Sequence, residues 1–341
     1  MATTRIGLLL GDPAGVGPEI IAKVLDQFGD TPGVHFSVIG TAETLAAGAD
    51  VARVGLPASL ATRGLSVSAD AHRLIGIDTS GIGRIKRGES SSAAGLFALR
   101  SMQAAVAAVQ AGRIEAIVYA PLNKHAMKLA GFAEVDELHY LANLFGSHGF
   151  CSELNQLDDL WTARVTSHVP LRDVAALITR ERVCDATRLA VATMRQAGIE
   201  QPRIVIVGLN PHAGDSGTIG TEDIDVIAPA VAQLRAEGLD AQGPVSPDTA
   251  FVTARRGGAK LIVTMYHDQG QIALKSMAFE RVLTILGGLP VPAITASAGS
   301  AYDIAGRNLA NPEALIRACG LARRMAETRR ASAAAPVAPT S

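Results

Sequence analysis

The sequence predicts an α/β fold with a largely parallel sheet covered by helices. Apolar runs alternate with glycine-rich turns and amphipathic segments along the 341 residues, which is typical of parallel strands joined by helices. Hydrophobic residues make up 48% of the chain but aromatic residues only 4%, so small aliphatic side chains must form most of the core. The length indicates two lobes or one large α/β domain.

The expected elements follow from the spacing of apolar residues and from turn signals. We predict strands at 5–10, 35–39, 116–119, 203–208, 261–266, 282–286 and 291–295. We predict helices at 17–28, 93–111, 124–130, 136–145, 222–237 and 312–329. Pro18 is tolerated in the first turn of the helix at 17–28, and Gly112 ends the helix at 93–111. Residues 331–341, rich in Ala, Pro and Ser, are expected to be disordered.

Charge and cysteine usage exclude several classes of protein. The formal net charge is −1, and no basic block is present, so the chain lacks the electrostatic footprint of a nucleic-acid-binding protein. No apolar stretch is expected to cross a membrane. Cys151, Cys184 and Cys319 are far apart and odd in number, so we expect buried thiols without disulfides. A cytoplasmic protein with a small-molecule ligand is the simplest prediction.

Three of the eight histidines lie where an α/β fold places its chemistry. His212 and His267 directly follow predicted strands, so both imidazoles are expected at strand ends, and His168 lies in the segment TSHVPL. Imidazole is a common ligand of divalent transition metals, and three imidazoles leave positions open for substrate oxygens. The spacing matches neither HExxH nor a zinc finger, so three unrelated surface or capping histidines remain an alternative.

Two aspartates and a lysine in the same half are further candidates. Asp248 and Asp268 are expected in loops, as partners of the ligands or as acceptors for substrate hydroxyls. Turn capping is the favoured alternative for both when the residues are taken alone. Lys275 ends an apolar segment, and it is either a general acid/base or carboxylate anchor or a lysine whose stem covers a helix end.

Two glycine-rich segments bear on cofactor binding. The segment GDPAGVGPE, at 11–19, matches neither a P-loop nor the Rossmann fingerprint, so its glycines are assigned to a tight turn and close helix packing. The segment GSAYDIAG, at 299–306, offers small residues that let the backbone approach an adenine ring, and Asp303 could accept from a ribose hydroxyl. The predicted cofactor residues are Gly299, Ser300, Ala301, Asp303, Ala305 and Asn311.

These motifs together resemble the 4-hydroxythreonine-4-phosphate dehydrogenase family along nearly the whole chain. The matching blocks are GDPAGVGPEI, APLNKHAMKLAG, TSHVPLRD, GLNPHAG, GTEDID, GPVSPDTAF and YHDQGQIALK. The segment GSAYDIAG also resembles the cofactor loop of isopropylmalate dehydrogenases. The resemblance implies an isocitrate/isopropylmalate dehydrogenase-like, two-lobed α/β/α fold over residues 1–330, in which 203–330 carries most of the metal and cofactor motifs.

The resemblance also implies a chemistry. His168, His212 and His267 would hold one divalent metal (Zn, Mg, Mn or Co) at the interface of a homodimer, with two ligands from one subunit and the third from the other. Asp248, Asp268 and Lys275 would contact a carboxylate substrate. NAD or NADP would take up the hydride as a hydroxyl is oxidised to a ketone, and decarboxylation would follow. We favour NAD because no basic cluster for a 2′-phosphate is evident near Asp303.

The chain departs from the family in the region that holds phosphate. Members that act on the phosphorylated amino acid carry Gly-His-Thr-Glu where this chain has the segment DELH at 136–139. An Asn and an Arg that hold substrate in the family fall at Thr284 and Ala293. Loss of a cation and gain of Glu137 are unfavourable for a phosphate. The candidates for an altered pocket are Glu137, Leu138, Thr284 and Arg281.

We therefore expect a paralogue that oxidises a non-phosphorylated hydroxy acid or carboxylated dihydrodiol. The segment LANLFG, at 141–146, resembles dehydrogenases of terephthalate cis-dihydrodiol. The alternative is 4-hydroxythreonine-4-phosphate dehydrogenase of pyridoxal phosphate biosynthesis. A third possibility is a chain that keeps the fold for acyl transfer, binding or assembly, but the segment at 299–306 has the features of a working cofactor loop.

Overall fold

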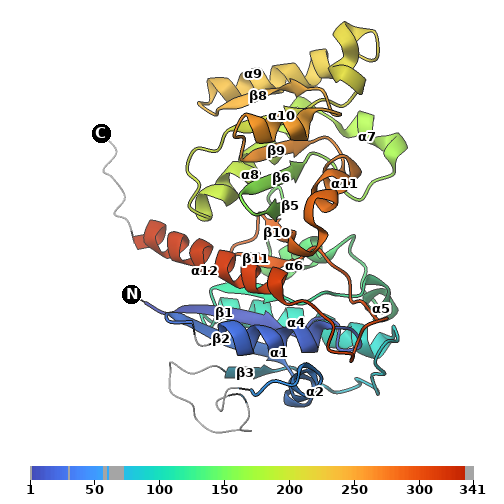
Figure 1. Cartoon of the computed structure of the whole chain (residues 1–341), viewed down its shortest axis with the longest axis vertical. Coiled ribbons are helices and arrows are strands. Elements are labelled where there is room, and N and C mark those ends of the chain that lie inside the picture. The colour runs from blue at the N-terminus through green and yellow to red at the C-terminus, as the bar shows by residue number, and fades with distance from the viewer. Residues whose placement is uncertain (1, 30, 57–59, 61–72, 335–341) are drawn as a thin grey trace. The chain divides into compact units, whose positions relative to one another are not determined.

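The protein consists of two compact units. The structure, a computed structural model, describes residues 2–29, 31–56, 60 and 73–334. Unit 1 comprises Met1–Ser147 and Leu289–Ser341, and unit 2 comprises His148–Gly288. Figure 1 labels the elements of both units.

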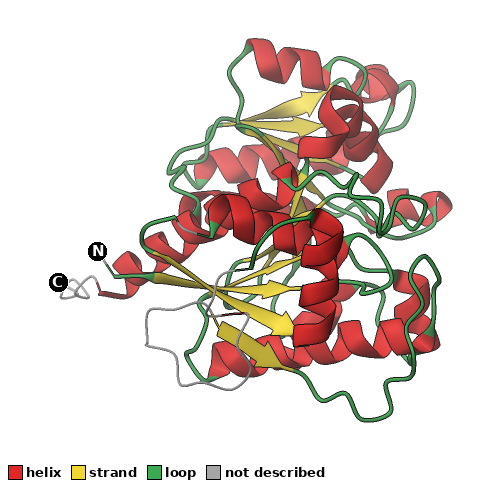
Figure 2. Ribbon diagram, turned by 60° about the horizontal axis from the view of Figure 1, so that its bottom comes forward, coloured by secondary structure: helices red, strands yellow, loops and turns green. Residues whose placement is uncertain are grey.

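The strands of unit 1 run parallel, and all of them except the outermost strand, β3, are almost entirely buried. Their order is β3 (Arg73–Gly76), β2 (Val34–Gly40), β1 (Thr4–Leu9), β4 (Ala116–Tyr119) and β11 (Ala293–Ala296). Every residue of β2, β4 and β11 is buried. Continuous burial requires cover on both faces of a parallel sheet, and Figure 2 shows helices on both sides of these strands.

Six helices surround the strands of unit 1 in the described part of the chain. They are α1 (Gly17–Phe28), α2 (Ala42–Ala52), α4 (Ser92–Gln110), α5 (Lys124–Leu129), α6 (Glu137–Phe145) and α12 (Glu313–Ala334). Helix α12 packs on β11, β4 and β1, while α4 packs on β1, β2, α5 and α6. Ser91, Asn123 and Asp136 each accept a backbone N–H at the start of their helices, which is ordinary N-capping.

The sheet of unit 2 is mixed, and its parallel part positions the histidines. The order is β10 (Leu283–Gly287), β5 (Ser152–Leu157), β6 (Leu160–Arg164), β9 (Leu261–Thr264), β7 (Ile204–Val207) and β8 (Ala241–Val245). Strand β5 pairs antiparallel with β10 and β6, whereas β6, β9, β7 and β8 pair in parallel. The carboxyl ends of β6, β9 and β7 therefore meet at one edge, and the segments that follow them carry His168, His267 and His212.

The helical segments of unit 2 lie between these strands in the sequence. They are α7 (Leu171–Leu177), α8 (Arg180–Gln196), η1 (Pro211–Gly217), η2 (Asp223–Ile227), α9 (Ala228–Ala236), α10 (Ala250–Arg256), α11 (His267–Ala278) and η3 (Phe279–Arg281). An apolar cluster that includes Val205, Ile262 and Leu274 joins β7, β9 and α11. Helix α11 is thereby held on the strand that precedes it.

The predicted fold class is confirmed, and the boundaries of most predicted elements agree to within a few residues. Asp268 was expected in a loop, but α11 begins at His267 and contains it, because the apolar face of this helix packs on the sheet. The predicted start of the disordered tail, residue 331, is too early. Residues 331–334 continue α12, since Ala favours a helix, and residues 335–341 lie outside the described residues.

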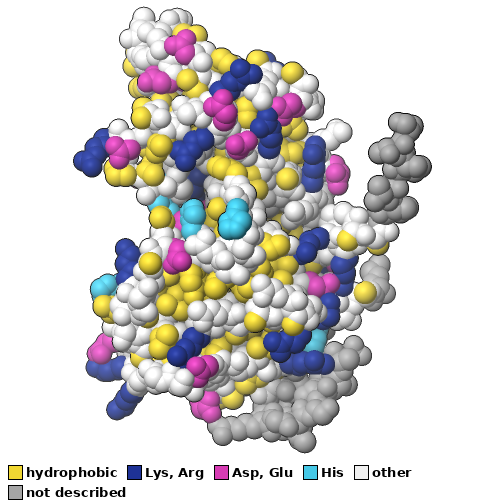
Figure 3. All heavy atoms as spheres, turned by 180° about the vertical axis from the view of Figure 1, so that it is seen from behind, with side chains coloured by type: hydrophobic (Ala, Val, Ile, Leu, Met, Phe, Trp, Pro, Cys, Tyr) yellow, Lys and Arg dark blue, Asp and Glu magenta, His cyan; other side chains and the backbone are white. Residues whose placement is uncertain are grey.

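Helix α4 satisfies the length and composition of a membrane span, contrary to expectation. Ten of its 19 residues are buried inside unit 1, including Phe97, Leu99 and Met102. Its apolar character is therefore explained by burial in the core of this unit. Across the face in Figure 3, Lys and Arg side chains are interspersed with Asp and Glu, as the scattered charge of the sequence predicts.

The crossing of α4 and α5 depends on Gly95. A Cβ atom at this position would lie 1.9 Å from the Ala126 carbonyl oxygen, so the two helices would have to separate. We expect Gly95→Ala to lower the free energy of unfolding by about 1–3 kcal/mol, measured by urea denaturation. Gly149→Ala is the matched control, because a Cβ there meets nothing within 4 Å. Equal stability of the two variants would contradict this packing.

Candidate metal and cofactor sites

His168 and His267 lie side by side at the carboxyl ends of two neighbouring strands. Their ring centroids are 5.5 Å apart, with an angle of 40° between the planes. Two imidazoles that bind one ion through metal–nitrogen bonds of about 2.0–2.1 Å in tetrahedral geometry have centroids roughly 5 Å apart. The pair therefore fits two ligands of one divalent transition metal.

The environment of His267 favours a neutral, oriented imidazole. Burial lowers the pKa of His267, the nearby charges of Arg164 and His168 act in the same direction, and Asp268 opposes them. Nδ1 lies 2.6 Å from Asp268 Oδ1. Because a carboxylate only accepts, Nδ1 carries the proton and Nε2 keeps its lone pair. A carboxylate behind an imidazole is a common arrangement around metal ligands.

His212 lies in an unusual left-handed segment. Five consecutive residues of η1, 212–216, have φ between +42° and +82°, and four of them are not glycine. Each non-glycine residue in this conformation costs roughly 1–2 kcal/mol, so neighbouring groups must hold the segment. His168 also has a positive φ, of 54°. Backbone strain of this kind is concentrated at functional sites.

His212 has an acidic neighbour of its own. The pKa of Asp248 is lowered mainly by the hydroxyl of Ser246, 2.6 Å from its Oδ1, and further by His212. Across the described residues of one chain, however, no three His, Cys, Asp or Glu side chains come close enough to hold a metal ion. The structure thus brings His168 to His267, but it does not bring all three histidines of one chain into one group.

Lys275 lies on α11 at some distance from His267. The separation of eight positions corresponds to about 12 Å along the helix axis. Lys275 Nζ lies 5.6 Å from the centroid of the Phe279 ring, a cation–π contact in the direction of the helix C-terminus. This geometry favours an anchor for an anionic group over proton transfer beside His267.

The substrate-pocket candidates of unit 1 have structural partners. Glu137 Oε2 lies 3.3 Å from Lys124 Nζ, and its side chain is only 15% exposed. Leu138 is 1% exposed, so its assignment to the pocket is wrong: it is a core residue of α6. The negative charge that argued against a phosphate is therefore largely compensated by Lys124.

Thr284 and Arg281, the candidates of unit 2, are also engaged elsewhere. Thr284 is buried in β10, and its hydroxyl accepts a hydrogen bond of 3.0 Å from Asn155 Nδ2. Arg281 pairs at 3.0 Å with Asp158, which precedes β6, whereas His168 follows β6. Arg281 therefore lies at the opposite end of these strands from the histidine pair of the same chain, and the assignment of Thr284 and Arg281 to the pocket stays a prediction.

The predicted cofactor loop of unit 1 is fastened to the glycine-rich turn after β1. Val16 N donates to Ser300 O at 3.0 Å, and the Tyr302 hydroxyl donates to Asp12 Oδ2 at 2.6 Å. A Cβ atom on Gly15 would lie 2.4 Å from Ser300 O, so only glycine allows this approach. The glycines of GDPAGVGPE thus support the loop at 299–306, in line with the predicted packing role.

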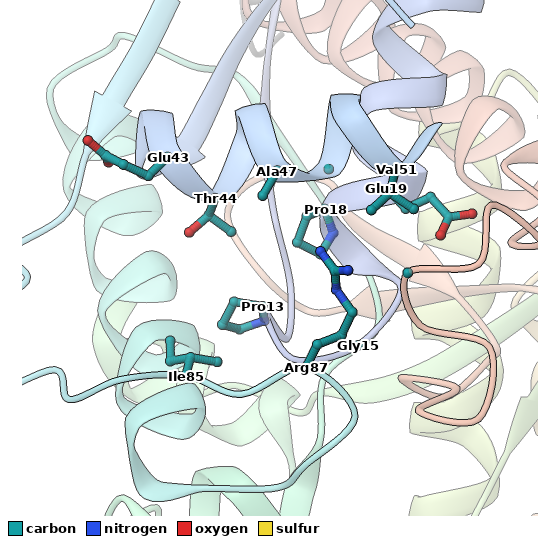
Figure 4. A pocket seen from close by; sticks show the side chains of 12 residues that line it. Pro13, Gly15, Pro18, Glu19, Glu43, Thr44, Ala47, Val51, Ile85 and Arg87 are labelled. Atoms are coloured by element: carbon teal, nitrogen blue, oxygen red, sulfur yellow. The ribbon is translucent and has the colours of Figure 1, made fainter. Parts of the chain in front are cut away.

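The remaining loop residues differ in their surroundings. Ala301 has a φ of 44°, Asp303 is exposed, and Asn311 Oδ1 accepts from Glu313 N at the start of α12. A cavity of about 270 Å³ lies beside the end of the loop, lined by Gly306, Arg87 and residues of α1 and α2. Figure 4 shows Arg87 directed across this cavity towards Pro18. Arg87 is more than 200 residues from the loop in sequence, so sequence reasoning missed it.

The hydrogen bond between Tyr302 and Asp12 gives a testable pH dependence. Burial, followed by the hydrogen bond to Asp12, raises the pKa of Tyr302. Since the unfolded pKa is about 10, the contribution to stability is complete below pH 10 and is lost as the pH rises towards the folded pKa. We expect Tyr302→Phe to cost about 1.5–3 kcal/mol at pH 8, and the difference from wild type to shrink above pH 10. Urea denaturation at pH 8 and pH 11 measures this.

Tyr266→Phe, which removes a phenol hydroxyl from unit 2, serves as the control for Tyr302→Phe. A constant stability difference between wild type and Tyr302→Phe at both pH values would contradict the role of the phenol.

Comparison with solved structures supports the predicted fold class. A β-decarboxylating dehydrogenase from Thermococcus kodakarensis shares the fold, with a TM-score of 0.51 at 16% identity over 99% of this chain and 90% of the other. At such low identity the likeness shows the fold alone, and it agrees with the predicted isocitrate/isopropylmalate dehydrogenase-like class.

The family follows from closer matches. Residues 34–322 match the family model described as pyridoxal phosphate biosynthetic protein PdxA. A relative from Rhizobium meliloti (strain 1021), provisionally named 4-hydroxythreonine-4-phosphate dehydrogenase 2, is 40% identical over 97% of this chain and 95% of its own. The chain belongs to the PdxA family, and the predicted resemblance is confirmed.

Other relatives differ in the substrates that their names give. The D-threonate 4-phosphate dehydrogenase of Pectobacterium atrosepticum is 34% identical over 94% of this chain and 99% of its own. A solved 4-hydroxythreonine-4-phosphate dehydrogenase from Klebsiella pneumoniae has a TM-score of 0.78 at 33% identity, covering 95% and 100% of the two chains. A terephthalate 1,2-cis-dihydrodiol dehydrogenase from Burkholderia xenovorans has a TM-score of 0.66 at 26% identity, covering 94% of this chain and 98% of its own. These relatives are dehydrogenases that act on CH–OH groups.

Proposed function

We propose that this protein is an NAD-dependent, divalent-metal-dependent dehydrogenase that oxidises a secondary alcohol of a phosphorylated hydroxy acid. The observation that carries the proposal is the His168–His267 pair, whose centroids are 5.5 Å apart and whose second member is oriented by Asp268. Imidazole ligands suit Zn²⁺ better than Mg²⁺ or Mn²⁺, which prefer oxygen ligands.

A second copy of this chain completes the proposed metal site with its His212. Two ligands from one chain leave a tetrahedral ion short of the three protein ligands that are usual in catalytic sites. Exposed apolar side chains on α10 and α11 fit a surface that a second copy covers: Val252 on α10 is 52% exposed and Ile272 on α11 is 70% exposed. A homodimer with a shared active site is therefore part of the proposal.

The proposed roles of the remaining residues follow from their positions. When bound, the divalent cation polarises the alcohol and carbonyl oxygens of the substrate. Residues 299–306 would hold NAD, which would supply the acceptor for the hydride of the alcohol carbon. Asp268 fixes the His267 tautomer, Asp248 accepts from a substrate hydroxyl beside His212, and Lys275 anchors an anionic group. If the ketone lies β to the carboxylate, loss of CO₂ leaves an enolate that a proton from solvent then quenches.

A phosphorylated substrate, which the alternative hypothesis predicts, has better support than the non-phosphorylated substrate of the first hypothesis. Relatives at 34–40% identity carry the names of 4-hydroxythreonine-4-phosphate and D-threonate 4-phosphate dehydrogenases. One objection from the sequence was Glu137, and Lys124 compensates its charge. The first hypothesis, a non-phosphorylated acid or dihydrodiol, keeps the other departures: the family's His-Thr pair is absent, Thr284 replaces its Asn, and Ala293, fully buried in β11, replaces its Arg.

Mixing two inactive variants tests the shared metal site. We expect His212→Ala and His267→Ala each to bind Co²⁺ poorly. After mixing and subunit exchange, half of the dimers are hybrids, and each hybrid has one intact site of two. About a quarter of the wild-type Co²⁺ sites should therefore return, measured from the visible absorption of bound Co²⁺.

The expected result depends on the ligands coming from both chains. If all three ligands came from one chain, every site in the mixture would lack a histidine and no binding would return. Mixing each variant with itself is the control for the exchange procedure.

A substrate panel tests the phosphate. We expect 4-hydroxythreonine 4-phosphate or D-threonate 4-phosphate to be oxidised with a kcat/KM exceeding that of its dephosphorylated form by about 10- to 100-fold, the loss typical of a charged hydrogen bond. NADH formation with added Zn²⁺, Co²⁺ or Mn²⁺ measures this, and terephthalate cis-dihydrodiol is included for comparison. Faster oxidation of the dihydrodiol would contradict the phosphorylated substrate and favour the first hypothesis, a non-phosphorylated one.

A further inference from the structure

The segments that carry the three histidines are joined by hydrogen bonds that pass through the backbone of Met265. Thr166, two residues before His168, bonds to Met265 O through both its amide, at 3.1 Å, and its hydroxyl, at 2.8 Å. Thr166 and Met265 are both buried. Met265 itself lies two residues before His267, so this contact ties the two histidine-bearing segments together.

Gln269 continues the connection towards the third histidine. Its Oε1 accepts from Met265 N at 2.7 Å, and its Nε2 donates to Gly208 O at 2.9 Å. An amide nitrogen of the backbone can only donate and a carbonyl can only accept, so the orientation of the Gln269 amide is fixed. Gly208 lies at the end of the strand before His212. One side chain therefore bridges the turn before His267 and the segment before His212.

Asp223 holds the same segment from the other side. Its carboxylate accepts from Leu209 N at 2.8 Å, from Asn210 N at 3.1 Å and from Asn210 Nδ2 at 2.9 Å. Asp223 is fully buried, and a Cβ atom on Gly208 would lie 2.6 Å from its Oδ1. Glu222 Oε2 accepts from the same Asn210 amide at 2.8 Å. The left-handed segment thus begins from a firmly fixed base.

We propose that Gln269 and Asp223 are positioning residues for the metal ligands. They fix the position of the His212 segment on its own chain, and thereby the place at which each chain presents His212 to the second copy's histidine pair. They do so without contacting the metal or the substrate. This inference rests on the proposed metal site. Its physical basis is that the strained residues 212–216 have no regular helix or strand to define their position, so hydrogen bonds at their base must define it.

The test measures Co²⁺ affinity, a quantity that a purely structural role would leave unchanged in folded protein. We expect metal-stripped Gln269→Ala to remain folded and to bind Co²⁺ about 10- to 100-fold more weakly than wild type, as is usual when an outer-shell partner of a ligand is lost. Asp223→Asn should weaken binding by a similar factor, because its amide nitrogen would face donors. Titration by visible absorption gives the affinity, and thermal unfolding without metal gives the folded fraction.

Three comparisons make the result decisive. Gln233→Ala loses two surface hydrogen bonds on α9 and should bind Co²⁺ like wild type. If Gln269→Ala does not fold, Gln269→Glu, which keeps the acceptor for Met265 N but sets a carboxylate against Gly208 O, replaces it and should show the same loss. Wild-type affinity in the folded Gln269 variant would overturn the inference. His212→Ala binding as tightly as wild type would instead overturn the proposed metal site.

Discussion

The parallel pairing of β6, β9 and β7 is the constraint on which the proposed site depends. Because these strands run in the same direction, the segments that follow them leave the sheet at one edge, and each carries one histidine. The 5.5 Å between the His168 and His267 rings is a direct consequence of β6 and β9 being neighbours. The antiparallel strands β5 and β10 fill the other side of the sheet and contribute no ligand to the proposal.

The same arrangement explains why the metal site needs more than strand pairing. Strand β7 pairs with β9 as β6 does, but His212 lies four residues beyond Gly208, in a left-handed segment with its own direction. Its position depends on side chains, Gln269 and Asp223, and not on the sheet. The cofactor loop at 299–306 follows a similar principle in unit 1, since the Asp12 carboxylate and the backbone of Val16 hold it. Both sites combine a strand end with a loop that polar contacts secure.

Sequence patterns predicted the fold class and most strands because apolar runs and glycine turns are local signals. They missed β5, β6 and α11, where polar residues such as Asn155, Arg164 and Gln271 are buried in mutual hydrogen bonds. The candidate histidines were found because strand ends can be recognised in the sequence. The residues that hold the histidine-bearing segments in place were not found. Gln269, Asp223 and Arg87 act through contacts between distant segments, and no local pattern indicates them. Leu138 was assigned to a pocket because it stands where the family has a substrate-binding residue, and such a match says nothing of side-chain direction.

In the proposed site, substrate binding depends on the metal ion, because the anionic substrate would have to lie beside the cation that the imidazoles hold. X-ray absorption of the Zn²⁺-loaded protein tests whether three histidines bind one metal ion. We expect a shell of about three imidazole nitrogens at roughly 2.0–2.1 Å, reduced by one imidazole in His212→Ala. A shell of oxygen or sulfur ligands without imidazole, or one that His212→Ala leaves unchanged, would contradict it.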